Sequence, residues 1–172
     1  MGCRFRDGLP AIQQPLQLND RTGAVCVTEY FPGGLPTPRP IVEPDTRIWW
    51  DAAERGDLLI PRCEPCGRAF WYPRGFCPRC SGSAIEWHLA TGLGEIYSYS
   101  IVRRAAGPWN PHTPFVLAYV NLDDGVTVQA NVVDCSMDEL AVGIRVRAVF
   151  ERKEDGDLPI LRFTPAREEL RT

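Results

Sequence analysis

The second half of the chain alternates between apolar and polar side chains. The clearest stretch places Ile144, Val146, Ala148 and Phe150 on one face of an extended segment. This period of two is typical of a β-strand with one face in a core. Runs of this kind, separated by turn formers such as Asp123-Asp124-Gly125, predict five strands over residues 94–103, 115–122, 126–133, 144–152 and 159–163.

A short polar insert separates the third and fourth predicted strands. Ser136 and Glu139 have the spacing of a helix capping box, and Gly143 follows where the short helix should end. Five strands with a short helix between the third and the fourth have the order of an OB-fold. The pattern therefore predicts an OB-type barrel over residues 89–166, followed by a tail at 167–172.

Residues 45–57 show a helical period instead. The predicted apolar face consists of Ile48, Trp49, Ala52 and Ala53, with Trp50 at its border. Asp45 or Thr46 can cap the start of this helix, and Gly56 can end it. A helix this short is only marginally stable by itself. Its apolar face must therefore dock either on the chain's own barrel or on a partner protein.

Residues 1–44 lack a convincing period and are rich in turn formers, as in the segment 32–40. They are predicted to form an extended or disordered lead. A start codon near Val25 or Val27 would make the preceding residues non-native, and the sequence leaves this open.

Four of the seven cysteines form two Cys-x-x-Cys pairs within residues 58–88. Each pair can make a tight turn in which two thiolates converge, and Gly67 and Gly82 suit the positive φ that often follows such turns. The pairs Cys63/Cys66 and Cys77/Cys80 therefore predict a ribbon that holds one zinc ion. Four thiolates leave no open position for water, so this zinc is expected to be structural. Two disulfides, an iron site or a ribbon that has lost its metal remain alternatives.

An aromatic run lies between the two cysteine pairs. A small ribbon has too little interior for all of these rings, and large exposed apolar patches mark interaction sites. The predicted partner- or ligand-binding surface consists of Trp49, Trp50, Phe70, Trp71, Tyr72 and Arg74.

Composition narrows the classes of function. The chain has 172 residues, 44% of them hydrophobic, and a net charge of −3, which indicates a folded protein and argues against a phosphate-backbone binder. No apolar run is long enough for a transmembrane helix, and no secretory signal is visible. With an odd number of cysteines, this predicts a reducing, cytoplasmic setting. Only two histidines are present, and no catalytic motif accompanies them.

An ordered set of motifs resembles a known family, the acyl-CoA-associated zinc-ribbon/OB-fold proteins labelled domain of unknown function thirty-five. The matching motifs are Trp49-Trp50, Gly56-Asp57-Leu58, Arg62-Cys63-x-x-Cys66-Gly67, Tyr72-Pro73-Arg74, Cys77-Pro78-x-Cys80, Thr91-Gly92-x-Gly94-Glu95-Ile96-Tyr97 and Phe163-x-Pro165. The resemblance covers about residues 46–166 and excludes the lead.

The resemblance implies a mainly β protein with a short N-terminal helix, a rubredoxin-like zinc ribbon and a five-stranded OB-fold barrel. It also implies a non-catalytic subunit that associates with a thiolase-like enzyme, namely a thiolase, an acyltransferase or an aldolase of lipid or steroid metabolism. In some members a hot-dog-fold hydratase is fused or bound. The OB-fold is expected to help bind or channel acyl-CoA together with the partner.

A single-stranded nucleic-acid binder is the alternative, because OB-folds and ribbons also serve that role. Charge argues against it: residues 121–157 carry nine acidic and four basic side chains, whereas a groove that follows a phosphate backbone needs excess positive charge. Residues 55–104 carry seven arginines and four acidic side chains. This basic region can meet the phosphates of CoA, an acidic partner or only solvent.

Overall fold

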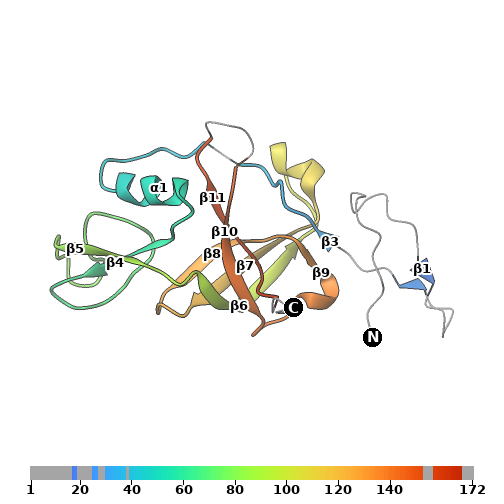
Figure 1. The fold of residues 1–172 in the computed structure, drawn as a ribbon. Coiled ribbons are helices and arrows are strands. Elements are labelled where there is room, and N and C mark those ends of the chain that lie inside the picture. Colours follow the sequence, from blue (N-terminus) through green and yellow to red (C-terminus); the bar gives the residue numbers. More distant parts are fainter. Residues whose placement is uncertain (1–16, 19–24, 27–29, 38, 153–156, 168–172) are drawn as a thin grey trace.

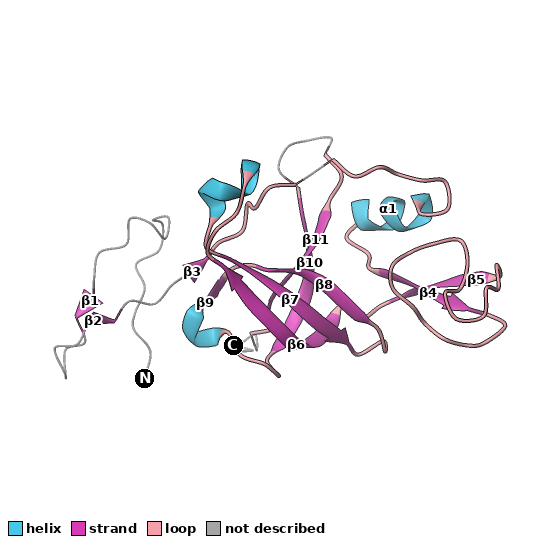
Figure 2. Ribbon diagram, turned by 180° about the vertical axis from the view of Figure 1, so that it is seen from behind, coloured by secondary structure: helices cyan, strands magenta, loops and turns pink. Residues whose placement is uncertain are grey.

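The computed structural model describes residues 17–18, 25–26, 30–37, 39–152 and 157–167. A closed β-barrel forms the centre of the molecule, with helix α1 (Arg47–Glu54) and the hairpin β4–β5 (Leu59–Cys63 and Ile85–Leu89) together on one side (Figure 1). Strand β3 (Tyr30–Phe31) lies on the other side (Figure 2). Two further short strands, β1 (Gln17–Leu18) and β2 (Val25–Cys26), pair with each other.

The barrel has five strands: β6 (Leu93–Val102), β7 (Phe115–Leu122), β8 (Thr127–Val132), β10 (Arg145–Glu151) and β11 (Ile160–Pro165). They are hydrogen-bonded in the order β10–β11–β8–β7–β6, and β6 pairs with β10 to close the ring. All neighbours are antiparallel except β8 and β11. A first strand that pairs with both the second and the fourth, together with a parallel pair between the third and the fifth, is the arrangement of an OB-fold. The five predicted strands are confirmed.

Inward-facing side chains fill the barrel. Seven of them are fully buried: Ile96, Val116, Val120, Val128, Val132, Val146 and Phe163. β-branched residues at alternate positions suit a strand whose inner face is packed and whose outer face is more open. At Gly94 the strands approach so closely that an added Cβ would lie 2.5 Å from the carbonyl oxygen of Asn121. The hydrophobic alternation in the sequence therefore marks the barrel core.

The predicted capping box between the third and fourth barrel strands is confirmed. A 3₁₀-helix covers Met137–Glu139, and the N–H of Ser136 donates to the carboxylate of Glu139 at 2.8 Å. Arg167 donates to the same carboxylate at 3.0 Å and to the carbonyl of Asp134. The insert is thereby fastened to the segment that follows the last strand.

The lead is more ordered than the sequence predicts over residues 30–37. Strand β3 pairs with β9 (Cys135–Ser136), and Phe31 is 1% exposed within the main core. Leu35 is 3% exposed and packs with Phe115 and Val133. Residues 30–37 are extended, and these two side chains anchor the segment on the barrel, a contact that the sequence did not predict. The rest of residues 1–29, apart from the β1–β2 pair, and residue 38 lie outside the described residues.

Helix α1 is shorter than the predicted range and presents a narrower apolar face. Trp49, Ala52 and Ala53 are buried, whereas Ile48 is 47% exposed and does not belong to the packed face. Trp49 contacts Phe150 of the barrel with a centroid separation of 6.1 Å. Of the two docking alternatives, the helix therefore packs on its own chain. Within the described residues, no helix has the length and apolar content needed to cross a membrane.

The two predicted caps of this helix have other partners. Thr46 occupies the N-cap position, but its hydroxyl donates to the carbonyl of Glu43 and makes no cap bond. Asp45 instead accepts a hydrogen bond from the N–H of Gly75 at 2.9 Å. Asp45 therefore joins the start of the helix to the ribbon. Gly56 has φ of 86° after the last turn, as predicted for a helix end.

Candidate metal centre and aromatic pocket

The ribbon brings the four paired cysteines to one point. Cys63 ends strand β4, and the other three lie in the loop that leads to β5. All four Sγ atoms lie within 4.8 Å of one another, and the Cys63–Cys80 and Cys66–Cys77 sulfur distances are 3.5 and 3.7 Å. A tetrahedral zinc with Zn–S bonds of about 2.3 Å requires sulfurs about 3.8 Å apart. The arrangement therefore fits a single tetrahedral ion.

The disulfide alternative does not fit this geometry. A disulfide requires an S–S distance of about 2.05 Å, and the four cysteines are free thiols at nearly twice that separation. With four sulfurs around one point, a zinc ion there would have no open coordination position. The site suits one structural zinc ion.

The two cysteine turns have matching backbones. In the first, the N–H of Gly67 donates to the carbonyl of Cys63 at 2.7 Å, and in the second, the N–H of Ser81 donates to Cys77 at 2.9 Å. Gly67 has φ of 68°, as predicted, but the equivalent position in the second turn is Ser81, with φ of 59°. The expectation that Gly82 adopts the positive φ is therefore wrong.

Gly82 has a different role in the ribbon. An added Cβ would lie 3.1 Å from Pro65 Cγ and 3.4 Å from the sulfurs of Cys63 and Cys80. A Cβ here would press on Pro65 beside the sulfur cluster, so this glycine is favoured by close packing and not by its φ angle.

Local electrostatics act on the thiols in opposite directions. Backbone amides of Cys80 and Arg79 lower the pKa of Cys77, and the Arg79 N–H lies 3.4 Å from its Sγ. Burial raises the pKa of Cys63, which is fully buried. A buried thiolate needs a nearby positive charge, and a zinc ion between the four sulfurs would supply it.

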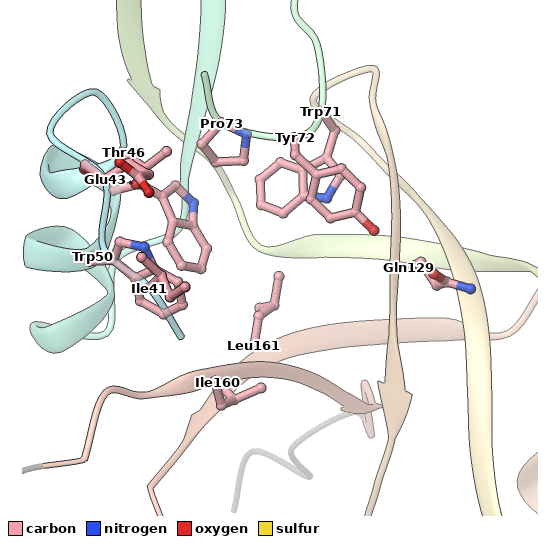
Figure 3. A pocket seen from close by; sticks show the side chains of 11 residues that line it. Ile41, Glu43, Thr46, Trp50, Trp71, Tyr72, Pro73, Gln129, Ile160 and Leu161 are labelled. Atoms are coloured by element: carbon pink, nitrogen blue, oxygen red, sulfur yellow. Dashed lines mark hydrogen bonds between the residues drawn. The ribbon is translucent and has the colours of Figure 1, made fainter. Parts of the chain in front are cut away.

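A second feature lies where helix α1, the ribbon and the barrel meet. An open pocket of about 360 Å³ is lined by Trp49 and Trp50 of the helix, by Trp71 and Tyr72 of the ribbon, and by Leu161 of strand β11. Figure 3 shows Trp50 on one side of this pocket and Trp71 and Tyr72 on the other, with Leu161 between them. We call it the aromatic pocket.

The six residues of the predicted binding surface occupy four different environments. Trp50 and Trp71 are half-buried and Tyr72 is 54% exposed, so these three present aromatic surface to the pocket. Trp49 is 6% exposed and forms the inner wall. Phe70 is 8% exposed and packs with Cys63 and Cys77 inside the ribbon, so its expected exposure is not found. Arg74 does not line the pocket and donates instead to the carbonyl of Tyr72 at 3.3 Å.

The predicted binding surface contains four of the eleven residues that line the pocket and misses the other seven. Ile41 and Glu43 come from the lead, and Gln129 and Ile160 come from the barrel. No local pattern marks these residues, because only the tertiary structure places them beside the helix.

A four-cysteine ribbon followed by a closed OB barrel defines a class, the zinc-ribbon/OB-fold proteins. Comparison with known proteins agrees. Residues 50–86 match the family model described as "ChsH2, rubredoxin-like zinc ribbon domain", and residues 87–151 match "ChsH2, C-terminal OB-fold domain". The chain belongs to the DUF35 family, which confirms the resemblance drawn from the sequence motifs.

Relatives and solved structures extend this comparison. A "DUF35 domain-containing scaffold protein" of Methanocaldococcus jannaschii is 34% identical over 119 residues, which are 68% of this chain and 84% of that protein. A "probable enoyl-CoA hydratase alpha subunit" of Thermomonospora curvata is 32% identical over 140 residues, 81% of this chain and 43% of that protein. Among solved structures, the "Ltp2-ChsH2(DUF35) aldolase" matches with a TM-score of 0.66 and 29% identity, covering 75% of this chain and 100% of that one.

Proposed function

We propose that this protein is a non-catalytic subunit that associates with a thiolase-like enzyme and helps to bind or channel acyl-CoA. The observation that carries the proposal is the partly exposed aromatic surface of Trp50, Trp71 and Tyr72 at the junction of helix, ribbon and barrel. Aromatic residues in such positions are typical energetic anchors of protein interfaces. In this proposal Cys63, Cys66, Cys77 and Cys80 hold the zinc that keeps the ribbon folded.

The chemistry of the described residues supports a non-catalytic role. His88 is on the surface and pairs with Glu86 at 3.0 Å. Cys135 is fully buried, and burial raises the pKa of its thiol to about 12, whereas a reactive cysteine needs a lowered pKa. The four-cysteine site offers no position for a zinc-bound water.

The names of the relatives support the class of partner. They describe a scaffold protein, an aldolase that contains a DUF35 component and a hydratase alpha subunit. We carry these over as a proposal: the partner is a thiolase-like enzyme, and a hydratase is a second candidate component.

A basic ribbon surface supports a contact with CoA. Arg62, Arg68 and Arg79 are exposed on the ribbon, where guanidinium groups suit phosphate oxygens. The nucleotide end of the thioester would lie on this side in our proposal.

The experiment is co-purification of the chain with a thiolase-like protein of the same organism. Trp50→Ala and Trp71→Ala should each weaken the complex about thirtyfold or more, as expected when an interface anchor is truncated. Met137→Ala is the matched control, because Met137 is 38% exposed in the 3₁₀-helix beside β9, on the barrel side away from α1. Zinc content and circular dichroism show whether each variant is folded.

Two results would contradict the proposal. One is that both tryptophan variants are folded and bind the partner as tightly as the wild type. The other is tight binding of single-stranded DNA or RNA at physiological salt with no thiolase association, which would favour the nucleic-acid alternative.

A further inference from the structure

We propose that the thiolase-like partner also covers a tyrosine face on the outside of the barrel, formed by Tyr97 of β6, Tyr119 of β7 and Gln129 of β8. The inference rests on the proposed function and deepens it, because it extends the docking surface beyond the aromatic pocket. It follows from the exposure of the two tyrosines, from the lack of charge on their strands and from the continuity of this face with the pocket.

The register of the sheet places these side chains in one row. Gln129 is directly opposite Tyr119, and Tyr119 is opposite Ser98 of β6. The register between β6 and β7 shifts between Ile96 and Ser98, so Tyr97 is the extra residue of a β-bulge. A bulge re-aims the side chain that it carries, and Tyr97 is turned to the outside. Figure 2 shows β8, β7 and β6 as neighbours in this order.

The two tyrosines expose much of their surface. Tyr97 is 63% exposed and Tyr119 is 46% exposed. Side chains that face each other across neighbouring strands have Cβ atoms about 4.5–5.5 Å apart, so the two rings belong to one patch. Exposed apolar patches mark interaction sites. Tyrosine is enriched in interfaces because its ring buries a large area while its hydroxyl can still form a hydrogen bond.

The strands that carry this face have almost no charge. Neither β7 nor β8 contains an acidic or basic residue, and β6 contains only Glu95. The cores of protein interfaces are likewise depleted of charged residues. β7 and β8 are the second and third barrel strands, on which other OB-folds bind oligonucleotides and oligosaccharides. A phosphate backbone requires Lys and Arg, which these strands lack, so a protein surface fits this face better than a nucleic acid.

Gln129 connects the tyrosine face with the aromatic pocket. It lines that pocket and is also directly opposite Tyr119. Figure 3 shows Gln129 beyond Tyr72, on the side of the pocket away from Trp50. A stable protein interface buries about 800 Å² on each partner, from roughly 20–30 residues. The three exposed aromatic side chains at the pocket cannot supply this area alone, so the interface must extend further.

Charge indicates the direction of that extension. The ribbon side exposes three arginines, and the outer face of helix α1 exposes Arg47, Asp51 and Glu54. Covering these groups would remove charge from water, which is costly unless each charge is paired. The tyrosine face is the uncharged continuation of the pocket, and a partner can cover it without that cost.

The experiment compares the full-length, zinc-loaded chain alone and in complex with a thiolase-like protein of the same organism. Hydroxyl radicals oxidise exposed tyrosine side chains, and mass spectrometry measures the rate for each one. Tyr30 is half-buried in β3, on the side of the barrel opposite α1 (Figure 2), and is the internal reference. The variants are Tyr97→Thr and Tyr119→Thr, since threonine suits a strand, with Met137→Ala as the control and zinc content and circular dichroism as checks of folding.

In the complex, oxidation of Tyr97 and Tyr119 should slow by about fivefold or more relative to Tyr30, because side chains in an interface core are fully buried. Each threonine variant should weaken the complex about tenfold, which is less than the loss of a tryptophan anchor. Met137→Ala should bind as tightly as the wild type.

Unchanged oxidation of both tyrosines, or unchanged affinity of both threonine variants, would overturn the inference alone if the complex still depends on Trp50 and Trp71. Failure of the wild-type chain to bind any thiolase-like protein would contradict the proposed function and this inference together. A dimer of the isolated chain that Tyr119→Thr dissociates would make a second copy the occupant and overturn the inference. Protection of the two tyrosines by single-stranded DNA or by an oligosaccharide, without a thiolase, would also overturn it.

Discussion

Replacing Arg162 by Met should separate the ordered part of the lead from the barrel. Arg162 lies on strand β11 with 5% of its side chain exposed, and its guanidinium contacts three parts of the chain. It donates to the side chain of Asn131 and, at 3.0 Å, to the carbonyl of Pro36 in the lead, and it pairs with Glu151 at 3.4 Å. Methionine fills similar space but supplies no donor and no charge.

The magnitude follows from the groups left behind. Two buried acceptors lose a donor, at about 1 kcal/mol or more each, and removing one partner of a buried ion pair costs about 3–5 kcal/mol. The Glu151 side chain is 20% exposed and still accepts the N–H of Gly34 at 3.3 Å, which favours the lower end. With the lower end of that range, we expect a total loss of about 5 kcal/mol in the free energy of unfolding.

Urea unfolding of the zinc-loaded protein measures this change, and Glu151→Gln completes a double-mutant cycle. The double variant should lose at least about 1 kcal/mol less than the sum of the two single variants, because it leaves no unpaired charge. Limited proteolysis should also show faster cleavage within residues 30–37 of Arg162→Met. An Arg162→Met loss under about 1 kcal/mol, or strictly additive effects, would refute this reasoning.

Three further predictions concern the ribbon and the barrel rim. Cys63→Ser and Cys77→Ser should each lower the zinc content, measured by elemental analysis, from one ion per chain to a small fraction. Each should also unfold the ribbon, since such zinc sites contribute on the order of 10 kcal/mol to folding. Finding iron in the wild-type protein, or a folded wild-type protein without metal, would contradict this prediction. Gly82→Ala should weaken zinc binding in a chelator competition, because its Cβ would press on Pro65 beside the sulfurs. Ser81→Gly, at a φ of 59°, should be neutral or should stabilise the fold by up to about 1 kcal/mol. Equal effects of the two substitutions on zinc binding would contradict this prediction. Hydrogen bonds from Arg145 hold the pKa of Asp123 below its usual value. This carboxylate therefore contributes stability above about pH 4, and the contribution is lost as the pH falls through the lowered pKa. Asp123→Asn should remove that part of the acid dependence of unfolding, and an unchanged pH dependence would contradict the assignment.

The sequence predicted best where one local rule decides the structure. Alternation identified all five barrel strands, because each places one face in a closed core. The Cys-x-x-Cys spacing identified the sulfur cluster, because each tight turn brings its own two thiolates together. In both cases the determining contacts repeat along the chain or lie close in it.

Prediction from the sequence failed where contacts between segments far apart in the chain determine the structure. Phe31 and Leu35 lie in a region without periodicity, and only the barrel surface that they fill makes them core residues. The aromatic pocket likewise combines the lead, the helix, the ribbon and two strands. The sequence analysis explained Gly82 by a positive φ angle, whereas the structure explains it by the closeness of its backbone to Pro65. The two reasons for a glycine cannot be told apart in the sequence.

The most direct test of the proposed function is acyl-CoA turnover measured for the isolated zinc-loaded chain, for its thiolase-like partner alone and for the reconstituted complex. We predict no turnover by the isolated chain, because its described residues present a closed metal site and no activated nucleophile, and higher turnover by the complex than by the partner alone. Steady turnover by the isolated chain that survives rigorous removal of thiolase, or a partner whose rate does not change on adding this chain, would contradict the account.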